Sequence, residues 1–505
     1  SPYRRMLGAA LDRPLRTLAI AYGLLLASLA LLPLFGRQFF PPAERDQLVV
    51  DIRLPEPASS ASTEQVVRQV VAIAGRHPEV AGGAAFIGGT APRFYYNIVP
   101  AVAADGTAQL LLNTRSIDEV PALVAAMQDE MAREVVGARV VVRRLEQGAP
   151  VDPPIQVRVT GDDLAQLRSI ADRIATAVRA AGADRVYDDL GNRLPILSIA
   201  LDQDRAALLG VDNASVGLVA ASSFKGVQVT ELREGDHLVP VVLRMREVER
   251  AEADRIRSLY VGTAAGERLP LAAIAALALD PQWPTIPRHD RRRSVTVCGY
   301  PPSGSLAIPT LERALPAIRA IALPPGYAIA IDGEAKELDA SQRSMGTILV
   351  ISLALIFLLL AMQFRSLAKA GAVMATVPLA LIGAFAGLAL FRSSLGFMAL
   401  LGIVSLAGVV VSHIIVLSDC IEDARERGLE LREALIRAGQ ARLRPVLVTV
   451  LATVLGLIPL ALHGGELWRP LAAVHIVGLT AGTALTLLVL PVIYWLLAVR
   501  LRWIT

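Results

Sequence analysis

An ionisable side chain lies within a long apolar stretch of the sequence. His413 follows Ser412 at the end of the run GVVVSH, residues 408–413. A polar group is costly in hydrocarbon, so such a residue is expected to face a polar interior. Because an imidazole exchanges its proton near neutral pH, His413 is a candidate for proton coupling. The alternative is a neutral histidine that hydrogen-bonds between helices.

A carboxylate follows on the same predicted helix. Asp419 lies about two helical turns after Ser412, so the two side chains are expected near the same face. Asp419 is therefore a second candidate for proton coupling. It is also close to the predicted end of the span, where a solvated carboxylate needs no functional explanation.

Aromatic residues gather in a predicted loop outside the membrane, at Phe86, Phe94, Tyr95 and Tyr96. Aromatic side chains can line an apolar substrate pocket, although such residues also build ordinary cores.

Motifs of other chemistries are missing from the sequence. There is no Gly-rich phosphate loop, no His/Cys metal cluster, no methionine-rich extracytoplasmic stretch and no recognisable Ser/His/Asp arrangement. We therefore expect no cofactor, no resident metal and no enzymatic activity. Cys298 and Cys420 are too few for a disulfide framework.

The elements that position these residues are six apolar runs, each about 20 residues long, the length that crosses a bilayer. They lie near 17–35, 345–364, 370–391, 396–419, 445–463 and 472–498. With 54% hydrophobic and 19% charged residues, the chain is predicted to be divided between lipid and water.

Basic residues in the short loops predict the orientation. Arginines and lysines concentrate before the first run, after the second, after the fourth and at the end of the chain. Because such residues favour the cytoplasmic side, both termini are predicted there and residues 36–344 outside. This placement accounts for the formal net charge of +4 without nucleic acid.

Strand and helix patterns alternate in the large extracytoplasmic segment. Residues 36–150 are predicted to form one β-α-β subdomain of ferredoxin-like type. The pattern restarts at 151–195 and finishes at 291–344, which predicts a second such subdomain. The stretch 196–290 interrupts it as an inserted module that contains a hairpin at Val227–Leu243.

The whole chain is thus predicted to be a six-helix membrane bundle with an α+β extracytoplasmic domain. Residues 1–16 form a cytoplasmic interfacial segment, and 17–35 form the first span. Residues 345–505 form the five remaining spans, with a cytoplasmic loop at 420–442.

Several local sequences resemble one half of a resistance-nodulation-division (RND) transporter of the hydrophobe and amphiphile type. They are FFPPAER at 39–45, VVDIRLPE at 49–56, FRSL at 364–367, RLRPVLVT at 442–449 and GLIPL at 456–460. Their order and spacing match the family's motifs over essentially the whole chain. The resemblance implies two porter subdomains with an inserted docking module.

The resemblance also implies which half is present. The first half of such transporters carries paired aspartates in its fourth helix, whereas GVVVSH contains none. The chain therefore resembles the C-terminal half, and the proton-binding aspartates are expected on an N-terminal half. Many family members have lysine and asparagine where this chain has Ser412 and His413. Thr449 matches a relay threonine, and Arg442 matches a basic residue at the cytoplasmic entrance.

By this resemblance the protein is expected to be a secondary active transporter, not an enzyme. It would export drugs or other small hydrophobic or amphiphilic compounds by proton antiport across the bacterial inner membrane. Its expected partners are membrane lipid, two further copies in a homotrimer, a periplasmic adaptor and an outer-membrane channel. The alternatives are export of lipid or polypeptide, and a non-transporting membrane scaffold or sensor.

Overall fold

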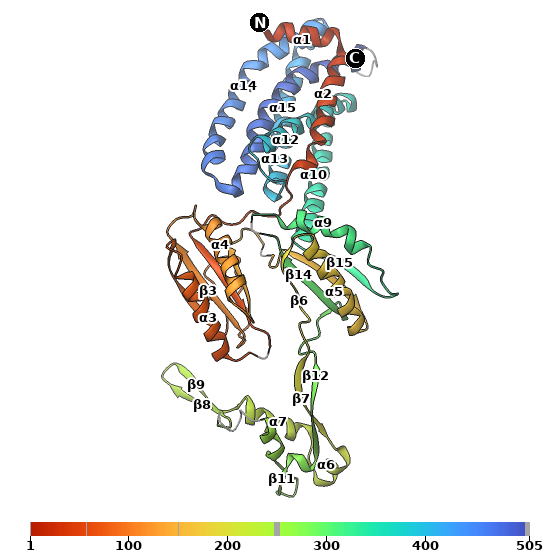
Figure 1. Cartoon of the computed structure of the whole chain (residues 1–505). Coiled ribbons are helices and arrows are strands. Elements are labelled where there is room, and N and C mark those ends of the chain that lie inside the picture. Colours follow the sequence, from red (N-terminus) through yellow and green to blue (C-terminus); the bar gives the residue numbers. More distant parts are fainter. Residues whose placement is uncertain (1, 57, 150, 247–252, 303, 500–505) are drawn as a thin grey trace. The chain divides into compact units, whose positions relative to one another are not determined.

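The computed structural model describes residues 2–56, 58–149, 151–246, 253–302 and 304–499. The chain divides into two units, Ser1–Leu190 with Pro287–Thr505 and Gly191–Ile286 (Figure 1). The first unit contains the long helices and two α/β subdomains. The second unit interrupts one of those subdomains in sequence.

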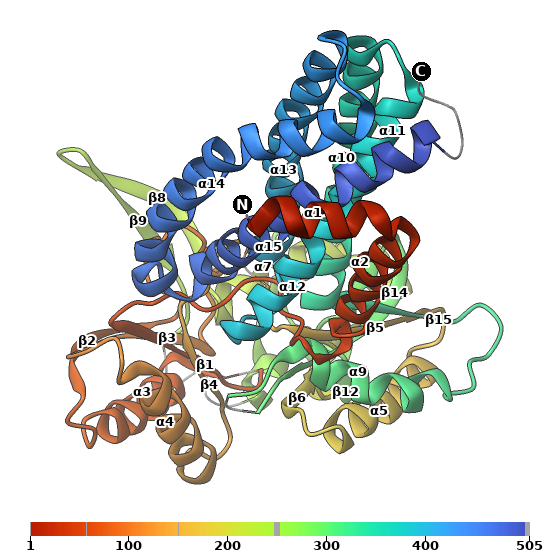
Figure 2. The ribbon, with the colours of Figure 1, turned by 90° about the horizontal axis from the view of Figure 1, so that it is seen from above.

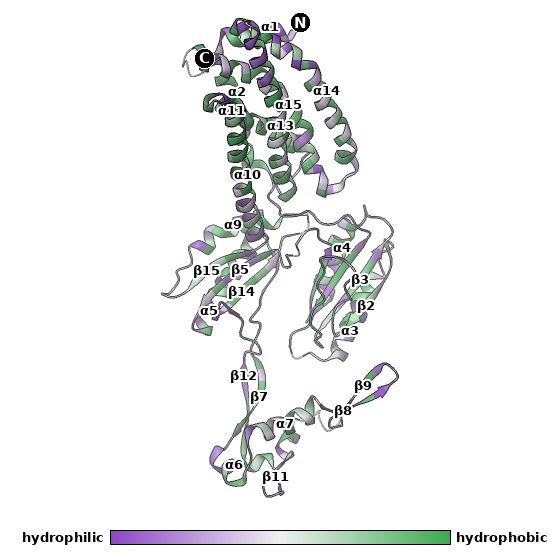
Figure 3. Ribbon diagram, turned by 180° about the vertical axis from the view of Figure 1, so that it is seen from behind, coloured by the Kyte–Doolittle hydropathy of each residue, from purple (hydrophilic) through white to green (hydrophobic). Residues whose placement is uncertain are grey.

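Long apolar helices make up the membrane part of the first unit, and hydrophobic residues dominate them (Figure 3). By length and composition, six helical segments of the described chain are able to cross a bilayer: Pro14–Leu34, Glu334–Phe364, Leu367–Leu390, Phe397–Glu426, Leu431–His463 and Gly465–Val499. A helix pair in the second unit, Gln203–Leu209 with Asn213–Phe224, also passes these criteria jointly but is bent by 92°.

The helices that form these segments follow in chain order. They are α2 (Pro14–Leu29), α10 (Glu334–Phe364), α11 (Leu367–Thr376), α12 (Ala380–Leu390), α13 (Phe397–Glu426), α14 (Leu431–His463) and α15 (Gly465–Val499). The region expected to be a cytoplasmic loop, 420–442, is mostly helical, because α13 continues to Glu426 and α14 begins at Leu431.

Helix α15 is the centre of the bundle and contacts α12, α13 and α14. Glycines permit the close approach of α12. A Cβ on Gly387 would lie 2.4 Å from the Ala473 carbonyl oxygen, and one on Gly383 would lie 2.6 Å from that of Val477. Helix α1 (Pro2–Asp12) lies across one end of the bundle (Figure 2), where the Tyr3 hydroxyl donates to the Leu487 carbonyl at 2.9 Å.

The first α/β subdomain has a β-α-β-β-α-β element order. Its elements are β1 (Gln47–Arg53), α3 (Ser60–Ala74), β2 (Val80–Ile87), β3 (Thr107–Thr114), α4 (Val120–Glu134) and β4 (Arg139–Arg144). The antiparallel sheet has the order β2-β3-β1-β4. Alternate residues of β1, including Leu48, Val50 and Ile52, are buried in the core formed with α3 and α4. Strand β2 was not predicted.

The second subdomain repeats this architecture. It contains β5 (Ile155–Gly161), α5 (Leu164–Ala180), β6 (Asp184–Asp188), β13 (Arg288–His289), β14 (Arg292–Tyr300), α9 (Ala307–Arg319) and β15 (Ala328–Gly333). The sheet has the order β13-β14-β5-β15, and β6 also pairs with β14. Asp163 caps α5 by accepting from the Gln166 backbone N–H at 2.8 Å.

The second unit is built around the antiparallel pair β7 (Leu194–Leu201) and β12 (Ala275–Gln282). Its remaining described elements include α6 (Gln203–Leu209), α7 (Asn213–Phe224), β8 (Val227–Glu234), β9 (His237–Leu243), β10 (Tyr260–Gly262) and β11 (Arg268–Pro270). Strands β8 and β9 form the predicted hairpin, with Gly235 in the left-handed region at φ 61°.

Candidate functional site

His413 lies on α13 with one ring nitrogen lacking a partner. The side chain is partly buried, and Nδ1 is buried without a hydrogen-bond partner among the described residues. A buried polar atom is normally paired, so this nitrogen is a candidate to bind a group outside the described residues. The neighbouring Ser412 is exposed.

Ser412 belongs to an exposed face of α13 that we call the α13 stripe, defined by Leu401, Ser405, Gly408, Ser412 and Val416. The spacing of three or four residues places them along one side of the helix. The centre of the α13 stripe is small and polar. The exposed face of α10 is different, because it consists largely of bulky apolar residues: Ile348, Val350, Ile351, Leu355, Leu358, Leu359 and Met362.

The other predicted relay residues are separate from one another. Thr449 is exposed, and its hydroxyl donates to the Val446 carbonyl of its own helix at 2.9 Å. Arg442 is partly buried, with Nε unpaired among the described residues, and Asp419 is partly buried near the end of α13. Within the described chain, no hydrogen bond or ion pair joins any two of His413, Ser412, Thr449, Arg442 and Asp419.

A second histidine was missed by the sequence analysis. His475 lies on α15 with 7% of its surface exposed. Its Nδ1 is 3.0 Å from the Leu471 carbonyl oxygen, and its Nε2 is 3.3 Å from the Ser405 hydroxyl oxygen. The available signal was a histidine within the last apolar run, by the same reasoning that selected His413.

A polar network joins three helices near the ends of α13 and α15. Lys369 Nζ of α11 is 2.8 Å from Glu422 Oε2 of α13. The Tyr494 hydroxyl of α15 donates to the other oxygen of Glu422, and Arg425 NH1 donates to the Tyr494 hydroxyl at 3.1 Å. No residue of this network was selected from the sequence.

The predicted aromatic group is only partly brought together. The rings of Tyr95 and Tyr96 are 4.7 Å apart. Phe94 and Tyr95 pack against a small core that includes Val49 and Leu145. Phe86 lies on β2, paired with Gln109, and not in a loop as predicted.

Charged side chains gather where the two α/β subdomains of the first unit meet. Arg143 Nε lies 2.6 Å from Asp51 Oδ2 and 3.7 Å from Asp152 Oδ2. The Tyr300 hydroxyl donates to Asp152 Oδ1 at 2.7 Å. Burial, reinforced by the nearby Asp152 carboxylate, raises the pKa of Glu146 to about 7.

Glu146 borders a cavity of about 170 Å³, together with Phe39, Phe40, Leu306 and Glu334. Within it the Phe39 backbone N–H donates to Glu334 Oε1 at 2.6 Å. The lining combines apolar side chains with two carboxylates and with the polar residues Gln38, Gln147 and Ser305.

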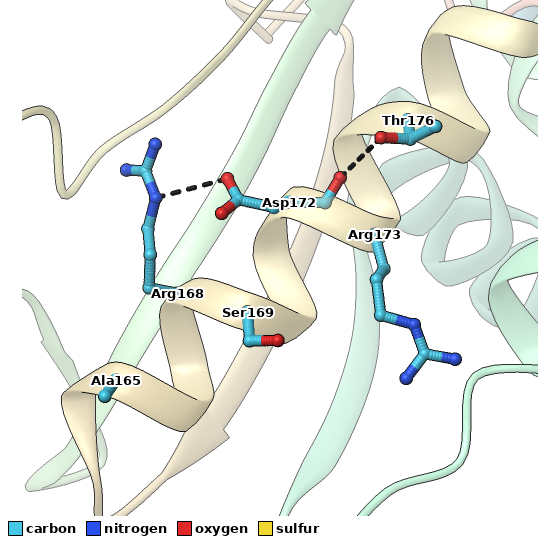
Figure 4. Close-up of a pocket in the computed structure, with 6 residues that line it drawn as sticks. All are labelled: Ala165, Arg168, Ser169, Asp172, Arg173 and Thr176. Atoms are coloured by element: carbon cyan, nitrogen blue, oxygen red, sulfur yellow. Dashed lines mark hydrogen bonds and ion pairs between the residues drawn. The ribbon is translucent and has the colours of Figure 1, made fainter.

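A wider hollow of about 560 Å³ lies on the outer face of α5 (Figure 4). Its polar side chains all come from this one helix. Arg168 Nε pairs with Asp172 Oδ1 at 3.1 Å, and the Thr176 hydroxyl donates to the Asp172 carbonyl at 2.8 Å. These groups do not converge on a common point, so this hollow does not define a binding site.

Metal ligands are sparse in the part of the chain that the structure describes. No group of three or more His, Cys, Asp or Glu side chains there is arranged to hold a metal ion. Both cysteines are free thiols.

The fold and the membrane helices define a multi-pass membrane protein with a large domain outside the bundle. The family model of the AcrB/AcrD/AcrF family matches residues 1–498. The chain therefore belongs to this family of RND permeases, and the family predicted from the local motifs is confirmed.

Individual relatives differ in what they are named for. The chain is 26% identical to the cobalt-zinc-cadmium resistance protein CzcA of Cupriavidus metallidurans over 488 residues, 91% of this chain and 45% of that protein. It is 32% identical to Protein HelA of Legionella pneumophila over 356 residues, 68% of this chain and 33% of that protein. It is 23% identical to the multidrug resistance protein MdtC of Yersinia pseudotuberculosis over 479 residues, 91% of this chain and 45% of that protein.

The crystal structure of a heavy metal efflux pump is similar in fold, with a TM-score of 0.78 and 26% identity. The match covers 99% of this chain and 51% of that chain. The chain thus spans between 33% and 51% of the length of these relatives.

Proposed function

We propose that the chain is the C-terminal half of a permease that exports small hydrophobic or amphiphilic compounds in exchange for protons. The observation that carries this proposal is the buried Nδ1 of His413 on a membrane helix, which has no hydrogen-bond partner within the ranges that the structure describes. An ionisable group held there without a partner is suited to bind or balance a proton supplied from outside this chain.

The partner is the N-terminal half of the permease. The chain spans about half the length of CzcA and MdtC, so the rest of a permease remains to be supplied. We infer that a helix of the N-terminal half packs on the α13 stripe. The residues at its centre, Ser405, Gly408 and Ser412, are small, and small residues allow two helix backbones to approach closely. Aspartates on that half would face His413, with Ser412, Thr449, Arg442 and Asp419 as the remaining relay candidates.

Proton entry would supply the energy for export. Each elementary charge that crosses the membrane contributes about 2.3 kcal/mol per 100 mV. Titration of groups between the halves would change helix packing, and the two α/β subdomains would open and close as rigid bodies. The protein would lie in the bacterial inner membrane with both termini cytoplasmic. It would form a homotrimer that docks, through 196–290, onto a periplasmic adaptor and an outer-membrane channel.

The proposal has two candidate substrates, an organic compound and a divalent metal ion. An organic substrate is favoured because no cluster of metal ligands occurs among the described residues. The aromatic side chains Phe94, Tyr95 and Tyr96, with Phe86 on β2, are the proposed contacts for such a compound. A divalent metal ion is the second candidate, because CzcA and the heavy metal efflux pump are named for metals.

The experiment compares the two substrates in liposomes that contain the complete permease. Under an imposed proton gradient, a fluorescent hydrophobic cation such as ethidium and Zn²⁺ are offered in parallel. We expect transport of the organic cation, with matching proton flux. Transport of Zn²⁺ alone would support the second candidate, and transport of neither would refute both.

A further inference from the structure

The hydrogen bonds of His475 determine where its protons lie. A carbonyl oxygen only accepts, so the contact between Nδ1 and the Leu471 carbonyl requires a proton on Nδ1. In the neutral ring, Nε2 is then an acceptor, and the Ser405 hydroxyl donates to it. In the charged ring, Nε2–H donates and the same hydroxyl accepts.

Both protonation states are therefore compatible with one arrangement of heavy atoms. Only the Ser405 hydroxyl must rotate when Nε2 gains or loses its proton. His413 differs, because its Nδ1 has no partner among the described residues. His413 thus has a ring nitrogen without a partner among the described residues, whereas both ring nitrogens of His475 have partners that suit the neutral and the charged ring.

Among the described residues, neither hydrogen-bond partner of His475 is a charged side chain. Helix α12 contains no titratable side chain, and α13 has none before His413, about 12 Å along the axis from Ser405. On α14 the nearest titratable group toward the outer end is His463, at its last residue. On α15 itself, Glu466 and Arg469 lie in the first turns. A proton on His475 would be stabilised chiefly by its two hydrogen bonds.

Ser405 also connects the buried ring to the edge of this half. Its side chain lies on the α13 stripe, where the N-terminal half is proposed to pack, while its hydroxyl reaches His475. His475 itself lies about 15 Å along the axis from the start of α15, which is roughly half the thickness of a hydrocarbon core.

We infer that His475 and Ser405 form a second proton-binding site, which exchanges protons with the surface between the two halves and lies apart from His413. The inference rests on the proposed proton coupling. The competing explanation is a permanently neutral histidine that only holds α13 to α15.

The test uses the complete permease in liposomes and measures two independent quantities. The first is the ¹⁵N NMR signal of the histidine rings, with the His475 signal identified by its loss in His475→Gln. The second is proton flux during substrate export. His463→Gln is the matched control, because His463 is exposed at the end of α14.

We expect the His475 signal to change from that of a neutral ring to that of a cationic ring as the pH of the sample is lowered. His475→Gln, which can still bond to Ser405 but cannot carry the proton, should lower coupled export by at least about fivefold. Ser405→Ala should do the same, and Ser405→Thr should restore export because it retains a hydroxyl. His463→Gln should leave export unchanged.

A His475 signal that stays neutral throughout would overturn the inference, as would normal coupling in His475→Gln or in Ser405→Ala. If His475→Gln does not fold, export by the Ser405 variants and the ¹⁵N titration of the wild-type permease test the inference instead. If the unmodified permease exports without proton flux, the proposed function fails, and the titration still reports separately whether His475 binds a proton.

Discussion

Glu146 should make the extracytoplasmic part of the protein less stable as the pH rises. Burial and the Asp152 carboxylate raise its pKa from 4.5 to about 7, so the folded chain holds this proton more tightly than the unfolded chain does. Below pH 4.5 both states are protonated and there is no penalty. Between pH 4.5 and 7 the unfolded chain ionises first, and stability falls.

The size of the effect follows from the two pKa values. A difference of about 2.5 corresponds to about 3 kcal/mol at 1.36 kcal/mol per pKa unit. Glu146→Gln should remove this penalty above pH 7 and change little at pH 5, because the amide oxygen can still accept from the Val151 backbone N–H. At roughly 2–4 °C per kcal/mol, the melting temperature should rise by several degrees at pH 8.

The assay is thermal unfolding of the purified chain at pH 5 and pH 8, followed by intrinsic fluorescence. Glu119→Gln, at an exposed position on the same subdomain, is the control and should have no effect. Equal melting temperatures for Glu146→Gln and wild type at pH 8 would show that the ionised carboxylate carries no penalty, and the reasoning would be wrong.

Three further predictions concern the membrane part. His413→Gln should abolish proton-coupled export while insertion stays normal, and near-normal coupling measured at matched expression would remove His413 from the relay. Cysteine at Arg392 should react with impermeant reagents from outside and cysteine at Arg432 should not; the reverse pattern would invert the orientation. Gly387→Val should destabilise the bundle by about 1–3 kcal/mol, because its Cβ would meet the Ala473 carbonyl oxygen; an unchanged melting temperature would contradict this packing.

Local patterns predicted many elements because their signals lie within a few residues. Helix α3 spans Ser60–Ala74, and its apolar residues Val67, Val70 and Ile73 share the buried face. The hairpin at Val227–Leu243 was predicted from the sequence, and β8 and β9 form it. In both, local propensity and tertiary structure agree.

Strand β2 was missed for an identifiable reason. Its sequence, VAGGAAFI, is rich in glycine and alanine, which have low strand propensity. Gly83 is needed there, because a Cβ would lie 2.4 Å from the Leu111 carbonyl oxygen of β3. That close approach depends on the partner strand, so it could not be inferred locally. Phe86 was placed in a loop as a consequence.

The candidate sites were predictable only in part. A histidine in an apolar run is visible in the sequence, and His413 was found in this way. His475 was missed. Its hydrogen-bond partner, Ser405, lies 70 residues away on another helix, so the pair could not be inferred from local sequence. The cluster of Arg143, Asp152 and Tyr300 likewise joins distant segments, so only the folded chain brings it together.

The most direct test of the account is proton-coupled export by this chain with and without an N-terminal half. Both halves are purified and placed in liposomes together or singly, and substrate export is measured with proton flux under an imposed pH gradient. The account predicts coupled export only when both halves are present, with collapse when a protonophore dissipates the gradient. Coupled export by residues 1–505 alone would contradict the account.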